Sequence, residues 1–412
     1  MSLEVINFGC RLNIAEGEAI RAAAGDQDDL IIINSCAVTA EASRQARQAI
    51  RRAAKRRPDA RIVVTGCAAE IDPGMFAGLA EVVGNRVKAA PASYGLPLLA
   101  TNAPAVSGHD HARAFIEVQN GCDHRCTFCI IPFGRGESRS IPAGAVIDAV
   151  KAAVDRGQQE VILTGVDLTS YGPDLPGAPT LGQLVERILK HVPALPRLRL
   201  SSMDSIEIDE RLLDIITGEP RVMPHVHLSL QSGDDMILKR MKRRHNRDQA
   251  IKLIETLKAR RPEIAIGADI IAGFPTETDA MFANSLALLD ECDIAFAHIF
   301  PYSPRPGTPA ALMPQVARAT IKDRAERLRA RASARKANWL QSLIGTRQRT
   351  LIELDGQTGH APNFAKVRLE TPLPASNMRG SMIDLRITAS DGQTLTGVPV
   401  GRGLSPVQRA TA

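Results

Sequence analysis

Three cysteines in one short loop constrain this chain more than any other feature. Cys122, Cys126 and Cys129 have a C-x3-C-x2-C spacing, directly after the apolar run from Ala114 to Val118. Three thiolates on one loop can bind three irons of a 4Fe-4S cluster and leave the fourth open, because full ligation takes four cysteines. A zinc finger would need a fourth Cys or His at a fixed spacing downstream, and the next cysteine is far along the chain. The spacing predicts a cluster with one open iron; structural or zinc-binding cysteines are the alternative.

A second set of three cysteines follows three predicted strands in the first part of the chain. The strands and their cysteines are Leu3 to Phe8 before Cys10, Leu30 to Ile33 before Cys36, and Arg61 to Thr65 before Cys67. Helical stretches separate these runs, so the order β-α-β-α-β predicts a parallel sheet. Ligands gather at the carboxyl ends of such strands, and we expect the three thiols to converge there on a second metal site. Cysteines that merely pack in an apolar core are the alternative.

Both cysteine sets occur with further motifs that are typical of one family. GCRLN (9–13), NSCAVT (34–39), VTGCAAE (64–70) and the aromatic Phe128 before Cys129 resemble the methylthiotransferases, which are radical S-adenosylmethionine (SAM) enzymes. The resemblance implies two 4Fe-4S clusters, an auxiliary one on the first trio and a SAM-binding one on the second. The implied ligands are Cys10, Cys36 and Cys67, then Cys122, Cys126 and Cys129. Cys292 is left over, and we interpret it as a packing residue.

The middle of the chain alternates strands and helices. Six strands are predicted, at 115–119, 160–166, 197–202, 225–230, 264–272 and 294–300. They suit a partial (β/α)6 barrel, the fold that the resemblance also implies, and barrel enzymes place their chemistry on the loops after the strands. The expected SAM contacts lie there: Gly165, Asp167, Ser202, Gln231 and Gly273. Gly273 lacks a side chain and would let adenine approach the backbone. Ordinary strand-to-helix turns are the alternative for these glycines.

The last part of the chain predicts a small antiparallel β-barrel, with short apolar alternations between Asp-Gly and Pro turns. It resembles the TRAM domain, an RNA-binding module. Phe364 could stack on a base, and Lys366, Arg368 and Arg379 could contact phosphates. A purely structural barrel is the alternative. The expected domains are an N-terminal methylthiotransferase domain (1–100), a radical SAM barrel (108–342) and the TRAM-like barrel (343–405).

The net charge predicts an anionic partner, and the N-terminus and the cysteines predict a location inside the cell. The net charge is +6, and basic residues gather at 44–57, at 239–247 and in the predicted helix 321–343. Each basic cluster is either a solvated face or a phosphate contact. No apolar run of about 18 residues is present, so no membrane partner is expected. The N-terminus lacks a secretory signal, and the cysteine spacings fit metal ligation in a reducing compartment. We therefore expect a cytoplasmic protein.

The resemblance also implies a reaction. SAM would yield methionine and a 5′-deoxyadenosyl radical that abstracts hydrogen, the auxiliary cluster would hold or supply sulfur, and a second SAM would donate methyl. His124 and His245 are expected to be loop or surface groups. Three pieces, NSCAVTAEASRQAR, HVHLSLQSG and FPYSPRPGTPAA, look most like the branch that methylthiolates C2 of N6-threonylcarbamoyladenosine at tRNA position 37. The expected partners are the tRNA anticodon loop and an electron-donor protein, with no DNA.

Four alternatives stay open. Two are sister branches, which act on isopentenyladenosine in tRNA or on an aspartate of a small-subunit ribosomal protein. A cationic ribosomal protein fits a basic chain less well than tRNA does. The third is a radical SAM enzyme of other chemistry, for which the first cysteine trio would be dispensable. The fourth is a non-catalytic RNA-binding protein with one structural metal.

Overall fold

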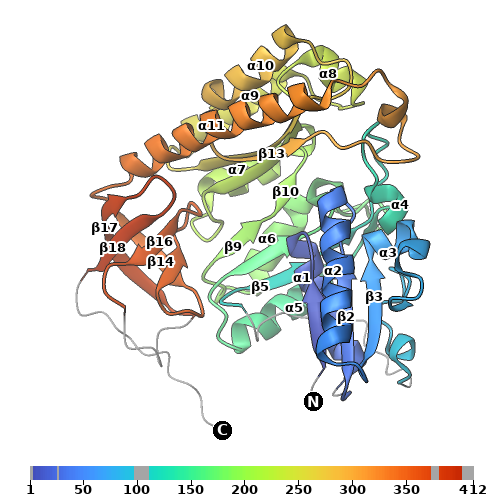
Figure 1. Cartoon of the computed structure of the whole chain (residues 1–412). Coiled ribbons are helices and arrows are strands. Elements are labelled where there is room, and N and C mark those ends of the chain that lie inside the picture. Colours follow the sequence, from blue (N-terminus) through green and yellow to red (C-terminus); the bar gives the residue numbers. More distant parts are fainter. Residues whose placement is uncertain (1–2, 26, 97–110, 373–379, 401–412) are drawn as a thin grey trace.

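The computed structural model describes residues 3–25, 27–96, 111–372 and 380–400 (Figure 1). It is a mixed α/β structure with two regions of parallel sheet and a closed C-terminal β-barrel, which confirms the predicted fold class. Arg379 of the predicted phosphate contacts lies outside the described residues.

The N-terminal region is a four-stranded parallel sheet in the order β1-β2-β3-β4. Its elements are β1 (Glu4–Asn7), α1 (Arg11–Ala24), β2 (Leu30–Ser35), α2 (Ala40–Arg56), β3 (Arg61–Gly66), α3 (Cys67–Ile71), β4 (Glu81–Val82), and the 3-10 helices Pro73–Phe76 and Pro91–Tyr94. Strand β2 is buried throughout. Its residues Ile31 and Ile33 pack with Ile50 of α2, while Leu30 and Ile32 pack with α1. The two-residue β4 carries no apolar alternation that sequence reasoning could detect.

The six predicted barrel strands form as expected, although the third is split in two. The parallel strands are β5 (Ala114–Glu117), β8 (Val161–Thr164), β9 (Leu198–Leu200), β10 (Ser202–Met203), β11 (His225–Gln231), β12 (Ala265–Ala272) and β13 (Ile294–Pro301). Around them lie α4 (Ile131–Arg135), α5 (Ala143–Asp155), α6 (Leu181–His191), α7 (Glu210–Gly218), α8 (Asp235–Arg240), α9 (Arg247–Arg260), α10 (Asp279–Glu291), the hairpin β6 (Gln119–Asn120) and β7 (Arg139–Ser140), and the 3-10 helices Leu168–Ser170, Ser205–Glu207 and Pro309–Leu312. One apolar core joins the strands to α5, α6, α7, α9 and α10 and includes Cys292, which is 1% exposed. Cys292 is therefore a packing residue, as predicted.

A long helix, α11 (Arg318–Ser342), runs across the top of the view in Figure 1 to the C-terminal barrel. The barrel is closed in the order β14-β15-β16-β18-β17. Its strands are β14 (Arg347–Ile352), β15 (Thr358–His360), β16 (Lys366–Leu369), β17 (Met382–Ser390) and β18 (Leu395–Pro399). Sequence reasoning missed β15, which is short and contains Gly359.

Phe364 lies where the three regions meet, and the expectation that it stacks on a base is wrong. The guanidinium of Arg199 lies 4.7 Å from its ring centroid, that of Arg11 lies 4.9 Å away, and His360 stacks on the ring at 4.7 Å. Arg199 in turn pairs with the fully buried Glu160 at 3.1 Å. The ring is therefore used to join the C-terminal barrel to the rest of the chain.

Candidate active site

Both cysteine trios line one cavity of about 350 Å³. The first trio lies at the carboxyl ends of β1, β2 and β3, as the parallel sheet predicts. The second lies on the loop between β6 and α4. The six cysteines are Cys10, Cys36, Cys67, Cys122, Cys126 and Cys129. The fold thus brings together two groups that lie far apart along the chain.

The first trio depends on close backbone packing at Gly9. Gly9 has φ +97°, and a Cβ there would lie 2.7 Å from both Cβ and Sγ of Cys36. The side chain of Asn13 donates to the carbonyls of Phe8 at 2.6 Å and of Ser35 at 3.3 Å. These bonds hold the ends of β1 and β2, and therefore the residues before Cys10 and Cys36, in place.

A buried ionic network joins the first trio to the second. Arg135 of α4 donates to Glu16 at 2.7 Å and to Asn13 at 2.6 Å, and Lys88 lies 2.6 Å from Glu16. Burial alone would raise the pKa of Glu16, but Lys88 and Arg135 lower it to about 2. Sequence reasoning missed this network because its members are distant in sequence and have no motif of their own.

Low pH should therefore lower the free energy of unfolding through protonation of Glu16. Its pKa is lower in the folded state than the ordinary value near 4.5, so its contribution to stability is present above pH 4.5 and is lost as the pH falls towards 2. We expect the free energy of unfolding to drop by a few kcal/mol over that range, at about 1.4 kcal/mol per pKa unit. Urea titrations between pH 6 and pH 3 measure this, and Glu16→Gln should show a flatter pH dependence. An equally steep fall in the variant would contradict the assignment.

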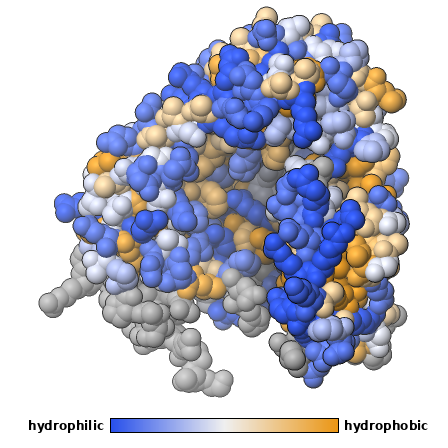
Figure 2. All heavy atoms as spheres, viewed as in Figure 1, coloured by the Kyte–Doolittle hydropathy of each residue, from blue (hydrophilic) through white to orange (hydrophobic). Residues whose placement is uncertain are grey.

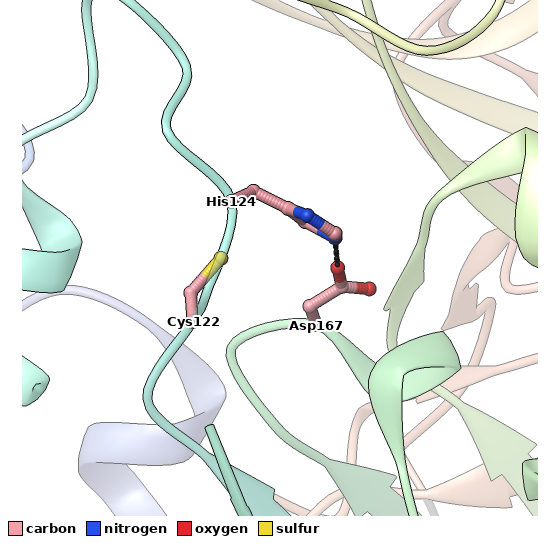
Figure 3. Close-up of side chains that lie close together, drawn as sticks. All are labelled: Cys122, His124 and Asp167. Carbon is pink, nitrogen blue, oxygen red and sulfur yellow. Dashed lines mark ion pairs between the residues drawn. The ribbon is translucent and has the colours of Figure 1, made fainter. Parts of the chain in front are cut away.

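The barrel side of the cavity carries a His-Asp pair that sequence reasoning undervalued. His124 Nε2 lies 2.9 Å from Asp167 Oδ2, and Cys122 stands on the same loop (Figure 3). Thr169 and Ser170 donate to the Asp167 carboxylate at 2.7 and 3.0 Å. The bond to Asp167 raises the pKa of His124. Burial would raise the pKa of Asp167, but its bonds to His124 and Thr169 lower it. His124 lies on a loop, as expected, and it also lines the cavity, which sequence reasoning did not anticipate.

Four of the five predicted SAM contacts line the cavity: Gly165, Asp167, Ser202 and Gln231. Gly273 lies outside the lining. A Cβ on Gly273 would lie 2.7 Å from Cγ1 of Ile321 in α11, so the missing side chain makes room for that helix instead of for adenine. His245 lies in a loop, as expected, but its side chain is buried, and it is away from the cavity lining.

Two arginines that sequence reasoning did not place at the site contact the cavity's cysteine segments. Arg243 Nη1 lies 3.7 Å from Cys126 Sγ, and its Nη2 donates to the Ser229 carbonyl at 2.7 Å. Arg305 Nη2 donates to the carbonyl of Ala37, next to Cys36, at 2.6 Å. Hydrogen bonds to ligand sulfurs tune the potential of iron-sulfur clusters. Arg243 is therefore placed to adjust a cluster bound by the second trio, while Arg305 fixes the backbone beside Cys36.

The chemistry of the thiols fits iron-sulfur clusters. Burial raises the pKa of Cys36 and Cys122 to about 11 and that of Cys129 to about 12. Such thiols keep their protons until a metal replaces them, and metal ligation releases those protons. Each trio offers three soft sulfur ligands, and none of the other described residues that line the cavity is a cysteine. Three ligands per cluster would leave one iron for another group.

A second polar cluster lies on the strands β11, β12 and β13. Asp269 Oδ1 lies 3.0 Å from His227 Nε2 and 3.2 Å from His298 Nδ1. Asp269 lines the cavity, and the side chain of His298 is 62% exposed. Because His298 Nδ1 bonds to Asp269, its Nε2 remains available to a ligand. This part of the barrel wall is therefore polar.

The fold and the site together assign this chain to the class of radical SAM proteins. Residues 116–289 match the Radical SAM superfamily, and residues 2–84 match a family described as Uncharacterized protein family UPF0004. The solved structure of the radical S-adenosylmethionine methyltransferase TsrM from Kitasatospora setae has a similar fold, with a TM-score of 0.52, 15% identity and 75% of each chain covered. Among the described helices, none has the length and apolar composition of a membrane span.

Relatives of nearly full length narrow this class to one family. Threonylcarbamoyladenosine tRNA methylthiotransferase MtaB from Rickettsia prowazekii is 49% identical, over 89% of this chain and 91% of that protein. The protein of the same name from Chlamydia pneumoniae is 33% identical, over 96% and 97%. The chain belongs to the family of methylthiotransferases that contains these MtaB proteins, as its motifs predicted.

Proposed function

We propose that this chain methylthiolates C2 of N6-threonylcarbamoyladenosine at position 37 of tRNA. The observation that supports this most is that two separate cysteine trios line one cavity. One trio alone would serve a radical SAM enzyme of other chemistry, whereas thiolation needs a second sulfur-bearing site. The proposed cofactors are two 4Fe-4S clusters, on Cys10, Cys36 and Cys67 and on Cys122, Cys126 and Cys129, together with S-adenosylmethionine.

Each region has a proposed part in this activity. Residues 1–100 hold the auxiliary cluster, residues 108–342 hold the SAM-binding cluster, and residues 343–405 contact RNA. In the last region Lys366 and Arg368 are exposed on β16 and available to phosphates. The anticodon loop of tRNA is the proposed substrate region, DNA is not a partner, and a separate electron-donor protein supplies reducing equivalents. A tRNA substrate places this activity in the cytoplasm.

The chain's own residues bind and orient the reactants. When bound, the clusters and S-adenosylmethionine supply the radical chemistry that an aromatic C–H bond without an acidic proton requires. We propose that Gly165, Asp167, Ser202 and Gln231 contact S-adenosylmethionine from the barrel side of the cavity. Asp167 is suited to this because its hydrogen bonds to neighbouring side chains hold it in one orientation.

The polar barrel wall favours the threonylcarbamoyl substrate over the isopentenyl one. The threonylcarbamoyl group carries a carboxylate, a hydroxyl and amides, whereas the isopentenyl group is apolar. His227, Asp269 and His298 offer hydrogen-bonding atoms beside the cavity. The exposed Nε2 of His298 and the second carboxylate oxygen of Asp269 can hydrogen-bond to a polar substituent, whereas an apolar substituent offers them no partner. The relatives' printed names point to the same substrate.

Mass spectrometry of tRNA nucleosides tests the proposal directly. In cells that lack this protein, we expect the 2-methylthio derivative of N6-threonylcarbamoyladenosine to disappear and its unthiolated precursor to accumulate. Reintroducing the wild-type gene should restore the derivative. Loss of the isopentenyl analogue would move the chain to the sister branch, and unchanged nucleosides would refute a role in tRNA thiolation.

A further inference from the structure

We propose that the exposed face of α2 is a docking stripe for the phosphate backbone of the RNA substrate. This stripe, hereafter the α2 stripe, consists of Arg44, Arg47, Arg51 and Lys55. The proposal rests on the proposed function, because it names the surface on which that substrate lies. It gives α2 a role that neither cofactor binding nor packing requires.

The periodicity of α2 places all four cations on one side. Their spacings of three and four residues repeat with the helical turn, and they span about 16 Å at 1.5 Å per residue. The opposite side carries Ala46, Ile50 and Ala53, which are buried against the sheet. The stripe therefore faces away from the sheet, and Figure 2 shows hydrophilic residues over α2 in the same view.

The α2 stripe begins at the mouth of the cofactor cavity. Thr39 caps α2 by accepting a hydrogen bond from the amide of Ala42 at 3.1 Å, and Val38 and Thr39 both line the cavity. An RNA strand with one base in the cavity would therefore have its neighbouring phosphates within reach of the first turns of α2. This continuity favours the nucleic-acid backbone over an unrelated anionic partner.

Many cations of the other two basic clusters pair with carboxylates of the protein. In α11, Arg324 pairs with Glu277, while Arg331 and Arg335 pair with Asp290. These pairs make α11 a strut that is bonded to the barrel. The sequence-based suggestion of phosphate contacts for this helix thus loses its main support.

Three arginines of the cluster at 239–247 are used in the same way. Arg243 and Arg244 pair with Asp204 at 3.1 and 3.0 Å, and Arg247 pairs with Glu291 at 2.6 Å. These arginines tie the segment to neighbouring parts of the barrel and are not free for a ligand.

The α2 stripe keeps its charge. Within the described parts of the chain, Arg47, Arg51 and Lys55 have no carboxylate within 4.0 Å. Arg44 pairs only with its helical neighbour Glu41, and both side chains are largely exposed. The buried Nε of Arg47 also has no hydrogen-bond partner among the described residues. Guanidinium groups of this kind match phosphate geometry and would lose little by exchanging water for RNA.

Phosphate contacts position a nucleic acid without reading its sequence. Each one releases counterions, so the slope of log Kd against log salt changes by about 0.7 to 0.9 per contact. Removing three contacts should therefore lower the slope by about 2 to 3. At 0.1 M salt this corresponds to a Kd about 100-fold weaker, and equally so for tRNA with and without the threonylcarbamoyl group.

The test compares two triple variants of the cluster-loaded full chain. The first is Arg47→Gln, Arg51→Gln and Lys55→Gln in the α2 stripe. The control is Lys322→Gln, Arg327→Gln and Arg331→Gln on α11, which removes the same charge from exposed side chains. Fluorescence anisotropy with labelled tRNA over a range of salt gives Kd and slope, and iron content per chain reports that each variant is folded and loaded.

We expect the loss of affinity and slope only in the α2 variant. Wild-type slope and Kd in that variant would overturn the inference, and so would an equal loss in the α11 control. If the α2 variant loses a wild-type affinity for anionic lipid vesicles but still binds tRNA with wild-type affinity, the stripe binds a membrane surface and the inference is overturned. If tRNA binds through α2 but cells lacking the protein keep their methylthio nucleoside, the proposed reaction fails while the docking surface stands.

Discussion

Replacing Cys36 by alanine should halve the iron content and abolish methylthiolation. Cys36 is 5% exposed and lies in the first trio on the shared cavity. With one of three ligands gone, the auxiliary cluster should be lost while the other trio is untouched, so iron should fall from about eight to about four per chain. SAM cleavage should persist, because it depends on the second trio. Anaerobic iron and sulfide analysis, with nucleoside mass spectrometry of the reacted tRNA, measures both effects.

Cys292→Ala is the matched control for this variant. Cys292 is also a buried thiol, but it lies in the barrel core away from the cavity lining. The control should keep about eight irons and full methylthiolation, with only the small stability loss of a core truncation. Full product from Cys36→Ala would favour a radical SAM enzyme of other chemistry, and absence of iron from the wild type would favour a non-catalytic protein.

Replacing Arg135 by methionine should cost about 3 to 5 kcal/mol of stability, because it removes one partner of a buried ion pair. Arg135 and Glu16 are both almost fully buried, at 4% and 5% exposure. Its loss would leave Glu16 with Lys88 as its one cation partner among the described residues and would remove the hydrogen bonds from Arg135 to Asn13 and Asn120. The variant should also lose iron from the first trio more readily, since Asn13 holds the ends of β1 and β2. Urea unfolding and iron retention on dilution measure the two effects.

A double-mutant cycle separates this coupling from general damage. Glu16→Gln, Arg135→Met and the double variant should give a coupling energy above about 1 kcal/mol if the pair acts as a unit. Arg331→Met serves as the control, because its ion pair with Asp290 is half exposed and should be worth less than about 1 kcal/mol. A loss in Arg135→Met no larger than in this control would show that the network does not join the two cysteine regions.

Much of the architecture could be read from local patterns. Apolar runs such as Leu30 to Ile33 became buried strands, because their side chains satisfy both faces of a covered sheet. The loop position of the cysteines after parallel strands was enough to predict their convergence. Short elements such as β4 and β15 could not be predicted, because two or three residues carry no detectable period.

Contacts between side chains could not be predicted from the sequence. Phe364 is an aromatic residue of the type that stacks on bases. In the structure, however, its ring contacts Arg11, Arg199 and His360 from three regions of the fold. His124 resembles any loop histidine until Asp167 is placed beside it. Both cases turn on contacts between residues that have no fixed separation along the chain.

By itself the sequence determined the family, the two cysteine trios and the order of strands and helices, since ligand spacing and hydrophobic period are properties of neighbouring residues. Only the tertiary structure decided which charges are free. The arginines of α11 and of α2 look alike in sequence, but folding brings carboxylates of other elements to Arg324 and Arg331 of α11. In the α2 stripe Arg44 pairs only with Glu41 of its own helix, and Arg47 and Arg51 have no carboxylate partner among the described residues. It also decided that Glu16 meets Arg135 across 119 positions, because such a pair exists only once the two regions have packed together.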